Sequence, residues 1–140
     1  MVKKIILILA PVIIICLLIA LNKIALDQKT TKPVAGEITI NGKNILVELA
    51  DTPEARARGL SGRPDLMAGH GLLFIFDKPG QYGFWMKEMN FPIDIIWLDA
   101  NYQIIDTWLN AQPASYPASY QPKNKAIYVL ETNPGEIPNL

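Results

Sequence analysis

The sequence has little of what thiol, disulfide and histidine chemistry requires. Its 140 residues include one cysteine, Cys16, and one histidine, His70. A single cysteine forms no internal disulfide, and the chain after residue 16 has no thiolate nucleophile. The Gly-x-Ser-x-Gly sequence of many serine hydrolases is also absent. The sequence therefore has no recognisable catalytic constellation, and it leaves open whether the protein is an enzyme.

An excess of charge of one sign is lacking as well. The 13 lysines and arginines balance the 13 aspartates and glutamates, so the formal net charge is zero. A basic excess is the usual electrostatic signature of a protein that binds nucleic acid, and this chain does not have it. We therefore expect no nucleic-acid partner, and we also predict no metal and no cofactor.

The N-terminal residues contain a long hydrophobic run. Residues 5–21 are 17 consecutive residues without a charge, and they are preceded by Lys3 and Lys4. This length is at the lower end of the ~17–25 residues that cross a bilayer as a helix. The basic flank favours a cytoplasmic N-terminus. We expect residues 1–22 to form a transmembrane anchor or signal segment, with the following domain on the extracytoplasmic side.

Two other outcomes remain open for this segment. Cleavage by signal peptidase would release a secreted protein, but it needs a small residue directly before the cut and a second small residue two positions earlier in the chain. Ala25 and Ala35 have Lys23 and Pro33 at that position. Lipidation of the single cysteine is disfavoured because a bulky isoleucine precedes it. Residues 23–36 combine charges, threonines, proline and glycine, which is typical of a flexible tether.

A tight turn begins the predicted domain. Residues 37–40 and 45–49 are rich in apolar side chains and flank an Asn-Gly pair. Both central residues of a type I′ turn need a positive φ, which asparagine and glycine tolerate best. The two-residue loop places Ile38 opposite Ile45. The pattern predicts a β-hairpin.

A short helix is predicted directly after the hairpin. Thr52 is a good N-cap, and the proline that follows it suits the first helical position. Gly59 can end the helix with a positive φ. A helix of two turns is marginal alone, so it must be held by packing, which we expect through Ala57 and Leu60.

Short apolar runs and turns alternate along the rest of the chain. The expected strands are residues 71–76, 82–87, 93–98, 103–108 and 126–131. Many short strands with one or two short helices predict a mainly β domain over residues 37–140, as an antiparallel β-sandwich or open barrel. A strand usually follows a turn such as residues 133–135, and the pattern therefore indicates that a C-terminal partner strand is missing.

An ordered set of short motifs runs through residues 37–136. The motifs are Leu49-Ala50, Thr52-Pro53-Glu54, Arg58-Gly59-Leu60-Ser61-Gly62-Arg63, Gly71-Leu72-Leu73-Phe74, Phe84-Trp85-Met86-Lys87, Pro92-Ile93-Asp94-Ile95-Ile96-Trp97 and Val129-Leu130-Glu131. Together they resemble the DUF192 family of mostly bacterial and archaeal proteins of unknown function. The resemblance implies a mainly β, sandwich-like domain that is often exported or membrane-anchored. It implies no catalytic residues.

One carboxylate interrupts the apolar run at residues 93–98. Asp94 shares a strand face with Ile96 and Leu98, and an unpaired buried carboxylate is costly. It is therefore expected either to have a structural partner or to serve a ligand. The structural partner would be a nearby cation or the backbone N–H groups of a neighbouring loop. The functional role would be to orient a ligand or to act as an acid or base.

We predict a shallow ligand-binding site of polar and aromatic side chains. Its residues are Arg58, Arg63, Trp85, Lys87 and Asp94. Two guanidinium groups can clamp a carboxylate or phosphate, and an exposed aromatic ring offers a platform. The structural alternative is that Arg58 caps the helix carbonyls and Arg63 bonds Asp94 or Glu131. The bound molecule is expected to be a small ligand or a protein partner in the cell envelope.

Two other functions remain open, and a third is disfavoured. One is a cell-envelope hydrolase acting on glycan, with Asp94 as acid or base. Another is a structural module that pairs an open sheet edge with a partner strand. A third is copper(I) binding by Met67 with His70 and by Met86 with Met89, which have the right ligand types. Their spacing does not direct the side chains together, so no metal site is predicted.

Overall fold

The computed structural model describes residues 35–140, which belong to one compact unit. The predicted membrane segment, residues 1–22, and most of the predicted tether lie outside the described residues. Between residues 35 and 140, no helix combines the length and hydropathy that a membrane crossing requires.

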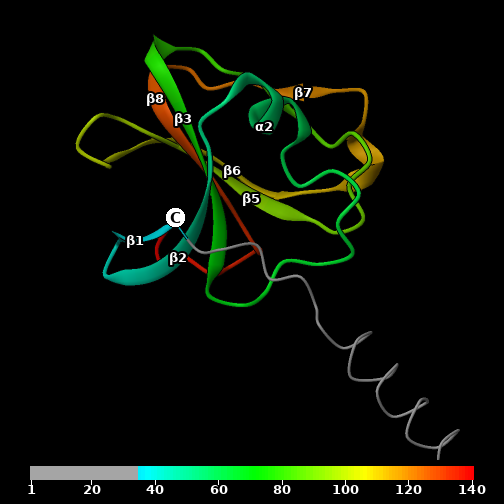
Figure 1. The fold of residues 1–140 in the computed structure, drawn as a ribbon, viewed down its shortest axis with the longest axis horizontal. Coiled ribbons are helices and arrows are strands. Elements are labelled where there is room, and N and C mark those ends of the chain that lie inside the picture. The colour runs from blue at the N-terminus through cyan, green and yellow to red at the C-terminus, as the bar shows by residue number, and fades with distance from the viewer. Residues whose placement is uncertain (1–34) are drawn as a thin grey trace, which may run out of the picture. The chain divides into compact units, whose positions relative to one another are not determined.

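The described part of the chain is mainly β, as predicted (Figure 1). The strands are β1 (Gly36–Ile40), β2 (Lys43–Ala50), β3 (His70–Gly80), β4 (Phe84–Trp85), β5 (Ile93–Leu98), β6 (Ile104–Ala111), β7 (Ser119–Tyr120) and β8 (Ala126–Thr132). A short helix, α2 (Pro53–Arg58), follows β2, and a single 3-10 turn, η1 (Pro113–Ser115), precedes β7.

The main sheet is mixed. Six strands lie in the order β1-β2-β3-β8-β5-β6, while β4 and β7 form a separate two-stranded sheet. β2 and β3 are parallel, with Leu46 opposite His70 and Ala50 opposite Phe74. The other neighbours in the main sheet are antiparallel. A parallel pair needs a long crossover, which the segment containing α2 supplies. The predicted antiparallel sandwich or open barrel is thus corrected to a mixed sheet.

The predicted hairpin is confirmed. Ile38 lies opposite Ile45, and Asn41 and Gly42 have φ values of 48° and 76°, as a type I′ turn requires. The side-chain amide of Asn41 also donates a hydrogen bond of 3.0 Å to the carbonyl oxygen of Pro138. This bond joins the turn to the C-terminal residues, and Figure 1 shows the C-terminus beside β1 and β2.

The short helix is confirmed with one change in its packing. The Thr52 hydroxyl accepts a 3.1 Å hydrogen bond from the backbone N–H of Ala55, and Gly59 ends the helix with a φ of 53°. Leu60 is buried as predicted, but Ala57 is exposed. Ala55 packs against the core in its place.

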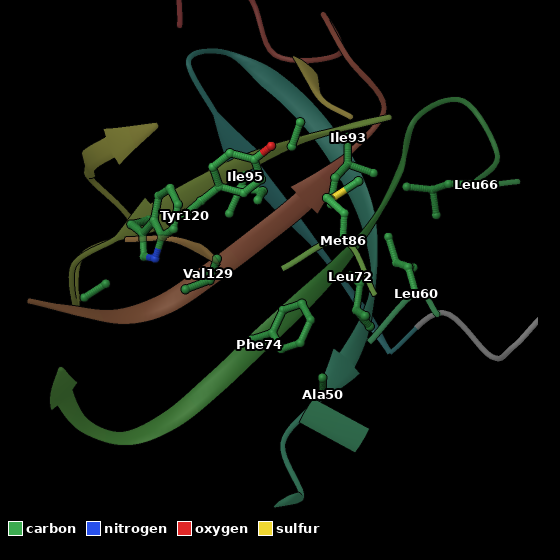
Figure 2. Close-up of a cluster of buried hydrophobic side chains, with 13 residues drawn as sticks. Ala50, Leu60, Leu66, Leu72, Phe74, Met86, Ile93, Ile95, Tyr120 and Val129 are labelled. Atoms are coloured by element: carbon green, nitrogen blue, oxygen red, sulfur yellow. The ribbon is translucent and has the colours of Figure 1, made fainter. Parts of the chain in front are cut away.

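Two buried clusters lie on opposite faces of the main sheet, because side chains alternate along each strand. Ile95 belongs to the first cluster and Ile96 to the second. In the first cluster, Figure 2 shows Phe74 and Val129 on the strands, with Leu60 among the side chains that pack over them from outside the sheet. The candidate site lies beside this first cluster.

The largest differences in strand length from the prediction are at β3 and at β4. β3 continues to Gly80, and its pairing with β8 is irregular between Ile75 and Gly80. A β-bulge of this kind lets a strand continue past residues that have no partner on the neighbouring strand. The strand predicted at residues 82–87 is reduced to the two residues of β4. After the turn at Gly135, the described residues contain no further strand, and Ile137 packs into the second cluster instead.

Candidate functional site

A cavity of about 360 Å³ opens between α2 and the main sheet. It is lined by α2 and the turn after it, by β3, by the segment that includes β4, and by one residue each from the following loop and from β8. The lining residues are Arg56, Ala57, Arg58, Gly59, Leu60, Ser61, Phe74, Phe76, Tyr82, Gly83, Phe84, Trp85, Met89 and Glu131. Small-molecule sites usually measure roughly 300–1,000 Å³, so the cavity suits a small ligand.

Glu131 is the buried acid of this cavity. The residue is 5% exposed, and its Oε2 atom has no hydrogen-bond partner among the described residues. Burial disfavours the charged form and raises the pKa of the carboxyl to about 8, although the positive charge of Arg63 lowers it. At neutral pH Glu131 is therefore mostly a protonated acid, which can donate a hydrogen bond as well as accept one.

Two arginines line the cavity, and they differ in how they are held. Arg56 Nη1 donates hydrogen bonds to the carbonyl oxygens of Asp51 and Ile75, at 2.7 and 2.8 Å. Its guanidinium carbon lies 5.4 Å from the ring centroid of Phe76, so Arg56 is fixed. Arg58 is exposed, and its guanidinium has no hydrogen bond or ion pair within residues 35–140. Arg58 therefore does not cap the helix carbonyls, which was the structural alternative for this residue.

Aromatic rings form much of the cavity wall. Phe76 and Tyr82 are stacked with their ring centroids 3.5 Å apart. Phe74 meets Phe84 edge to face at 4.8 Å. Such contacts restrict the movement of each ring, which gives the cavity a fixed apolar surface for a ligand to pack against.

Trp85 lines the cavity and is 53% exposed. Its ring meets that of Tyr116 at a centroid distance of 6.0 Å. Lys87 Nζ lies 5.9 Å from the same tryptophan ring, within the range of a cation–π contact. Lys87 is therefore next to a lining residue, but it does not line the cavity itself.

Arg63 is held by a partner that the sequence does not suggest. Its Nη1 and Nη2 atoms donate to Oε1 and Oε2 of Glu48 at 2.8 and 2.9 Å. This is the bidentate geometry in which arginine and carboxylate bind most strongly. The expectation that Arg63 bonds Asp94 or Glu131 is therefore wrong, because Glu48 on β2 accepts both N–H groups.

Asp94 accepts backbone N–H bonds, one of the two structural roles expected for it. Its Oδ1 accepts from the N–H of Asn110 at 2.7 Å, and its Oδ2 accepts from the N–H of Gly135 at 2.8 Å. The residue is 2% exposed. Neighbouring Ile95 is in the first cluster, so Asp94 faces the opposite side of the sheet. Of the five predicted site residues, only Arg58 and Trp85 line the cavity.

The described residues offer no metal site of the usual kind. Between residues 35 and 140, no three histidine, cysteine, aspartate or glutamate side chains gather closely enough to hold an ion. Of the methionines considered for copper, Met86 is buried in the first cluster, whereas Met67 is 46% exposed.

Comparison with known proteins now identifies the domain. Residues 36–140 match the DUF192 family, which is described as "Uncharacterized ACR, COG1430". The chain belongs to the DUF192 family. The resemblance seen in its motifs is thereby confirmed. No curated protein matches the chain.

Two solved structures share the fold of this DUF192 domain. One is a protein from Sinorhizobium meliloti 1021 described as a "putative transcription regulator", with 33% identity and a TM-score of 0.65. The match covers 72% of this chain and 79% of that one. The other is a protein of unknown function from Novosphingobium aromaticivorans DSM 12444, with 28% identity and a TM-score of 0.65. That match covers 74% of this chain and 79% of the other.

Glu131 is the residue of the DUF192 domain that sequence reasoning missed as part of a site. The sequence suggests Glu131 only as a partner of Arg63. The signal was nevertheless present, because Glu131 ends an apolar run at residues 126–130, much as Asp94 interrupts another. The sequence does not show that Asp94 is bonded to two backbone amides while Glu131 lines a cavity with an unpartnered oxygen.

Proposed function

We propose that this DUF192 domain binds a small molecule in the cavity between α2 and the main sheet. The observation that carries the proposal is the state of Glu131. Native proteins rarely leave a buried carboxyl oxygen without a hydrogen-bond partner, and Glu131 Oε2 has none among the described residues. Since this residue lines a cavity of about 360 Å³, a bound molecule can supply the missing partner.

The composition of the cavity wall supports binding in preference to glycan hydrolysis. Most glycosidases need two carboxyl groups on opposite sides of the scissile bond. Among the described residues that line the cavity, Glu131 is the only carboxyl. Rigid aromatic walls and a few polar groups are instead typical of a binding site for a small ligand.

A large side chain at the mouth of the cavity is expected to abolish binding. Ala57 lines the cavity but is exposed on α2, so Ala57→Phe should obstruct the mouth without disturbing the core. We expect compounds from a small-molecule fragment library to raise the Tm of the wild-type full chain, and to lose at least about tenfold in affinity for the variant. Thermal unfolding in the presence of each compound measures both effects.

The matched control is Ala100→Phe, which places the same ring in an exposed turn outside the cavity lining. It should bind every active compound as the wild type does. Compounds that stabilise the wild type and Ala57→Phe equally would show that the cavity is not where they bind. A library without any stabilising compound would count against the proposed function itself.

We further propose that residues 1–22 anchor the domain to a membrane, with the domain on the extracytoplasmic side. The support is the run of 17 uncharged residues at 5–21 behind two lysines. Replacing Ile13 and Leu17 together by arginine should abolish anchoring, because each charge at the centre of a span costs about 2.5–3.5 kcal/mol on insertion scales. The measurement is the fraction of chain that stays in alkaline-washed membranes.

The control for the anchor exchanges Ile13→Leu and Leu17→Ile, which keeps the run apolar and should keep the chain in the membrane. The mass of the recovered protein also separates an intact anchor from a cleaved signal. A wild-type chain that is recovered in the soluble fraction with residues 1–22 still present would refute the anchor.

A further inference from the structure

The charges around the cavity do not balance. Arg56 and Arg58 both line it, and the one carboxyl among its described lining residues is Glu131. Because burial keeps this acid mostly protonated at neutral pH, it does not neutralise the two guanidinium groups. The cavity therefore presents a positive potential to an entering molecule.

The exposed and the buried polar groups of the lining offer different chemistry. Arg58 is exposed and has no partner within residues 35–140, so its N–H donors are free at the mouth. Glu131 is 5% exposed and ends in an unpartnered oxygen, so it is the buried polar group of the lining. The aromatic side chains Phe74, Phe84 and Trp85 also line the cavity.

We propose that the ligand is a small carboxylic acid with an apolar, ring-sized body. Its carboxylate pairs with Arg58 at the mouth, and an oxygen at its far end accepts a hydrogen bond from Glu131. This inference rests on the proposed function, since it names the class of molecule that the same cavity binds. Guanidinium and carboxylate form strong paired hydrogen bonds, and the rings supply stacking contacts for a planar body.

An amine is the main alternative, because aromatic rings beside a carboxyl can also bind a cation. It fits less well here. An ammonium group would need Glu131 to ionise in its buried position, and it would then sit in a cavity lined by Arg56 and Arg58. A carboxylate needs neither change. The volume of about 360 Å³ exceeds that of the roughly 150 Å³ cavity that holds benzene in another protein, which leaves room for a single substituted ring.

The test uses four probes of nearly the same shape. They are 4-acetylbenzoate, 4-acetylbenzamide, 4-acetylbenzylamine and 4-isopropylbenzoate. The first of them, 4-acetylbenzoate, carries both the carboxylate and the ketone oxygen, and each of the other three probes changes one of these two groups. Binding to the full chain is measured by titration calorimetry at pH 7. We expect 4-acetylbenzoate to bind about tenfold more tightly than the amide or the amine, as a charge-assisted pair predicts.

Variants of the two polar lining residues assign the contacts. Arg58→Gln should remove the preference for the carboxylate over the amide, whereas Lys125→Gln, an exposed cation outside the cavity lining, should leave it unchanged. Glu131→Gln keeps a hydrogen-bond donor, so it should keep the preference for the ketone over the isopropyl compound. In the wild type the preference for the ketone should fall above pH 8, because the ionised Glu131 carboxylate no longer donates a hydrogen bond. In Glu131→Gln the preference should not change with pH.

Three results would overturn this ligand class. They are tightest binding by the amine, equal binding of acid and amide to the wild type, and no binding by any of the four probes at millimolar concentration. The Ala57→Phe variant separates these results from failure of the proposed function. If other fragments still bind and lose affinity in Ala57→Phe, the cavity is a binding site and only the assigned class is wrong.

Discussion

Glu131→Gln is expected to stabilise the domain at neutral and alkaline pH, although it changes a fully buried side chain. The carboxyl titrates near 4.5 in an unfolded chain and at about 8 in the folded protein, because burial disfavours its charged form. At pH 7 the unfolded state is therefore favoured by ionisation. At this pH the difference between the folded-state and unfolded-state pKa values corresponds to about 3 kcal/mol of lost stability. Glutamine has nearly the same shape and does not ionise, so we expect a gain of roughly 1–3 kcal/mol.

The effect of pH has a definite sign. The folded-state pKa of Glu131 is raised, so the contribution of the acid is fully favourable below about pH 4.5, where both states are protonated. It is lost progressively as pH rises to about 8, and little changes beyond that value. The variant and the wild type should therefore have similar stability at pH 4.5, and the difference between them should widen up to pH 8 and then level off.

Equilibrium urea unfolding of the full chain between pH 4.5 and 9 measures this difference, with the fluorescence of Trp85, Trp97 and Trp108 as the signal. Glu37→Gln is the control, since Glu37 is exposed on β1 and should give a small difference that does not change with pH. A Glu131→Gln variant that is less stable than wild type at pH 8 would mean that the carboxylate is paired in the folded protein, which would remove the main support for the binding site.

The gain predicted for Glu131→Gln bears on function. Because its pKa is raised by burial, the Glu131 side chain is expected to weaken the fold at neutral pH, and its Oε2 has no hydrogen-bond partner among the described residues in return. Proteins keep such groups mainly where a ligand or a reaction uses them. If Glu131→Gln both stabilises the domain and changes the pH dependence of ligand binding, the same side chain is responsible for the cost in stability and for the binding.

Local signals in the sequence were enough to predict the hairpin and the helix. The turn at Asn41 and Gly42 needs positive φ at both residues, and few other pairs allow it. The helix is capped by Thr52 at its N-terminus and by Gly59 at its C-terminus, and both caps involve only neighbouring residues. The mainly β class followed from the alternation of short apolar runs and turns.

Pairings between distant segments were not predictable in the same way. The parallel register of β2 and β3 depends on how the segment with α2 crosses over, and no residue pattern in either strand encodes it. The pair between Arg63 and Glu48 spans two elements, and several other carboxylates were equally plausible partners from the sequence. The two buried acids, Asp94 and Glu131, look alike as isolated charges beside apolar runs. Only the folded chain separates the one that is bonded from the one that is not.

Asp94→Asn is expected to destabilise the domain strongly and to leave the ligand preference of the cavity unchanged. Both carboxylate oxygens accept backbone N–H bonds, from Asn110 and Gly135, at 2.7 and 2.8 Å. An asparagine has one acceptor oxygen, so its NH₂ group would face one of these N–H donors. Leaving a buried donor without a partner, next to a group that repels it, costs roughly 2–4 kcal/mol.

The positions of the two donors explain why the loss should spread beyond one contact. Asn110 lies near the end of β6 with a φ of 53°, and Gly135 lies in the turn after β8, so Asp94 holds both of these segments to β5. Asp99→Asn is the matched control, because Asp99 Oδ1 also accepts two backbone N–H bonds, from Asn101 and Gln103, in an exposed turn. Its loss should cost at most about 1 kcal/mol, since water replaces the partners.

Urea unfolding and probe binding, measured on the same samples, separate the two roles of Asp94. We expect a large fall in the free energy of unfolding, with wild-type affinity for 4-acetylbenzoate under conditions where the variant is folded. A variant with wild-type stability that no longer binds the probe would place Asp94 in the ligand site instead. Asp94 faces the opposite side of the sheet from the first cluster. It therefore leaves the shared site predicted from the sequence and acts as a structural carboxylate, whereas Glu131, the carboxyl proposed to bind the ligand, lines the cavity on the other face.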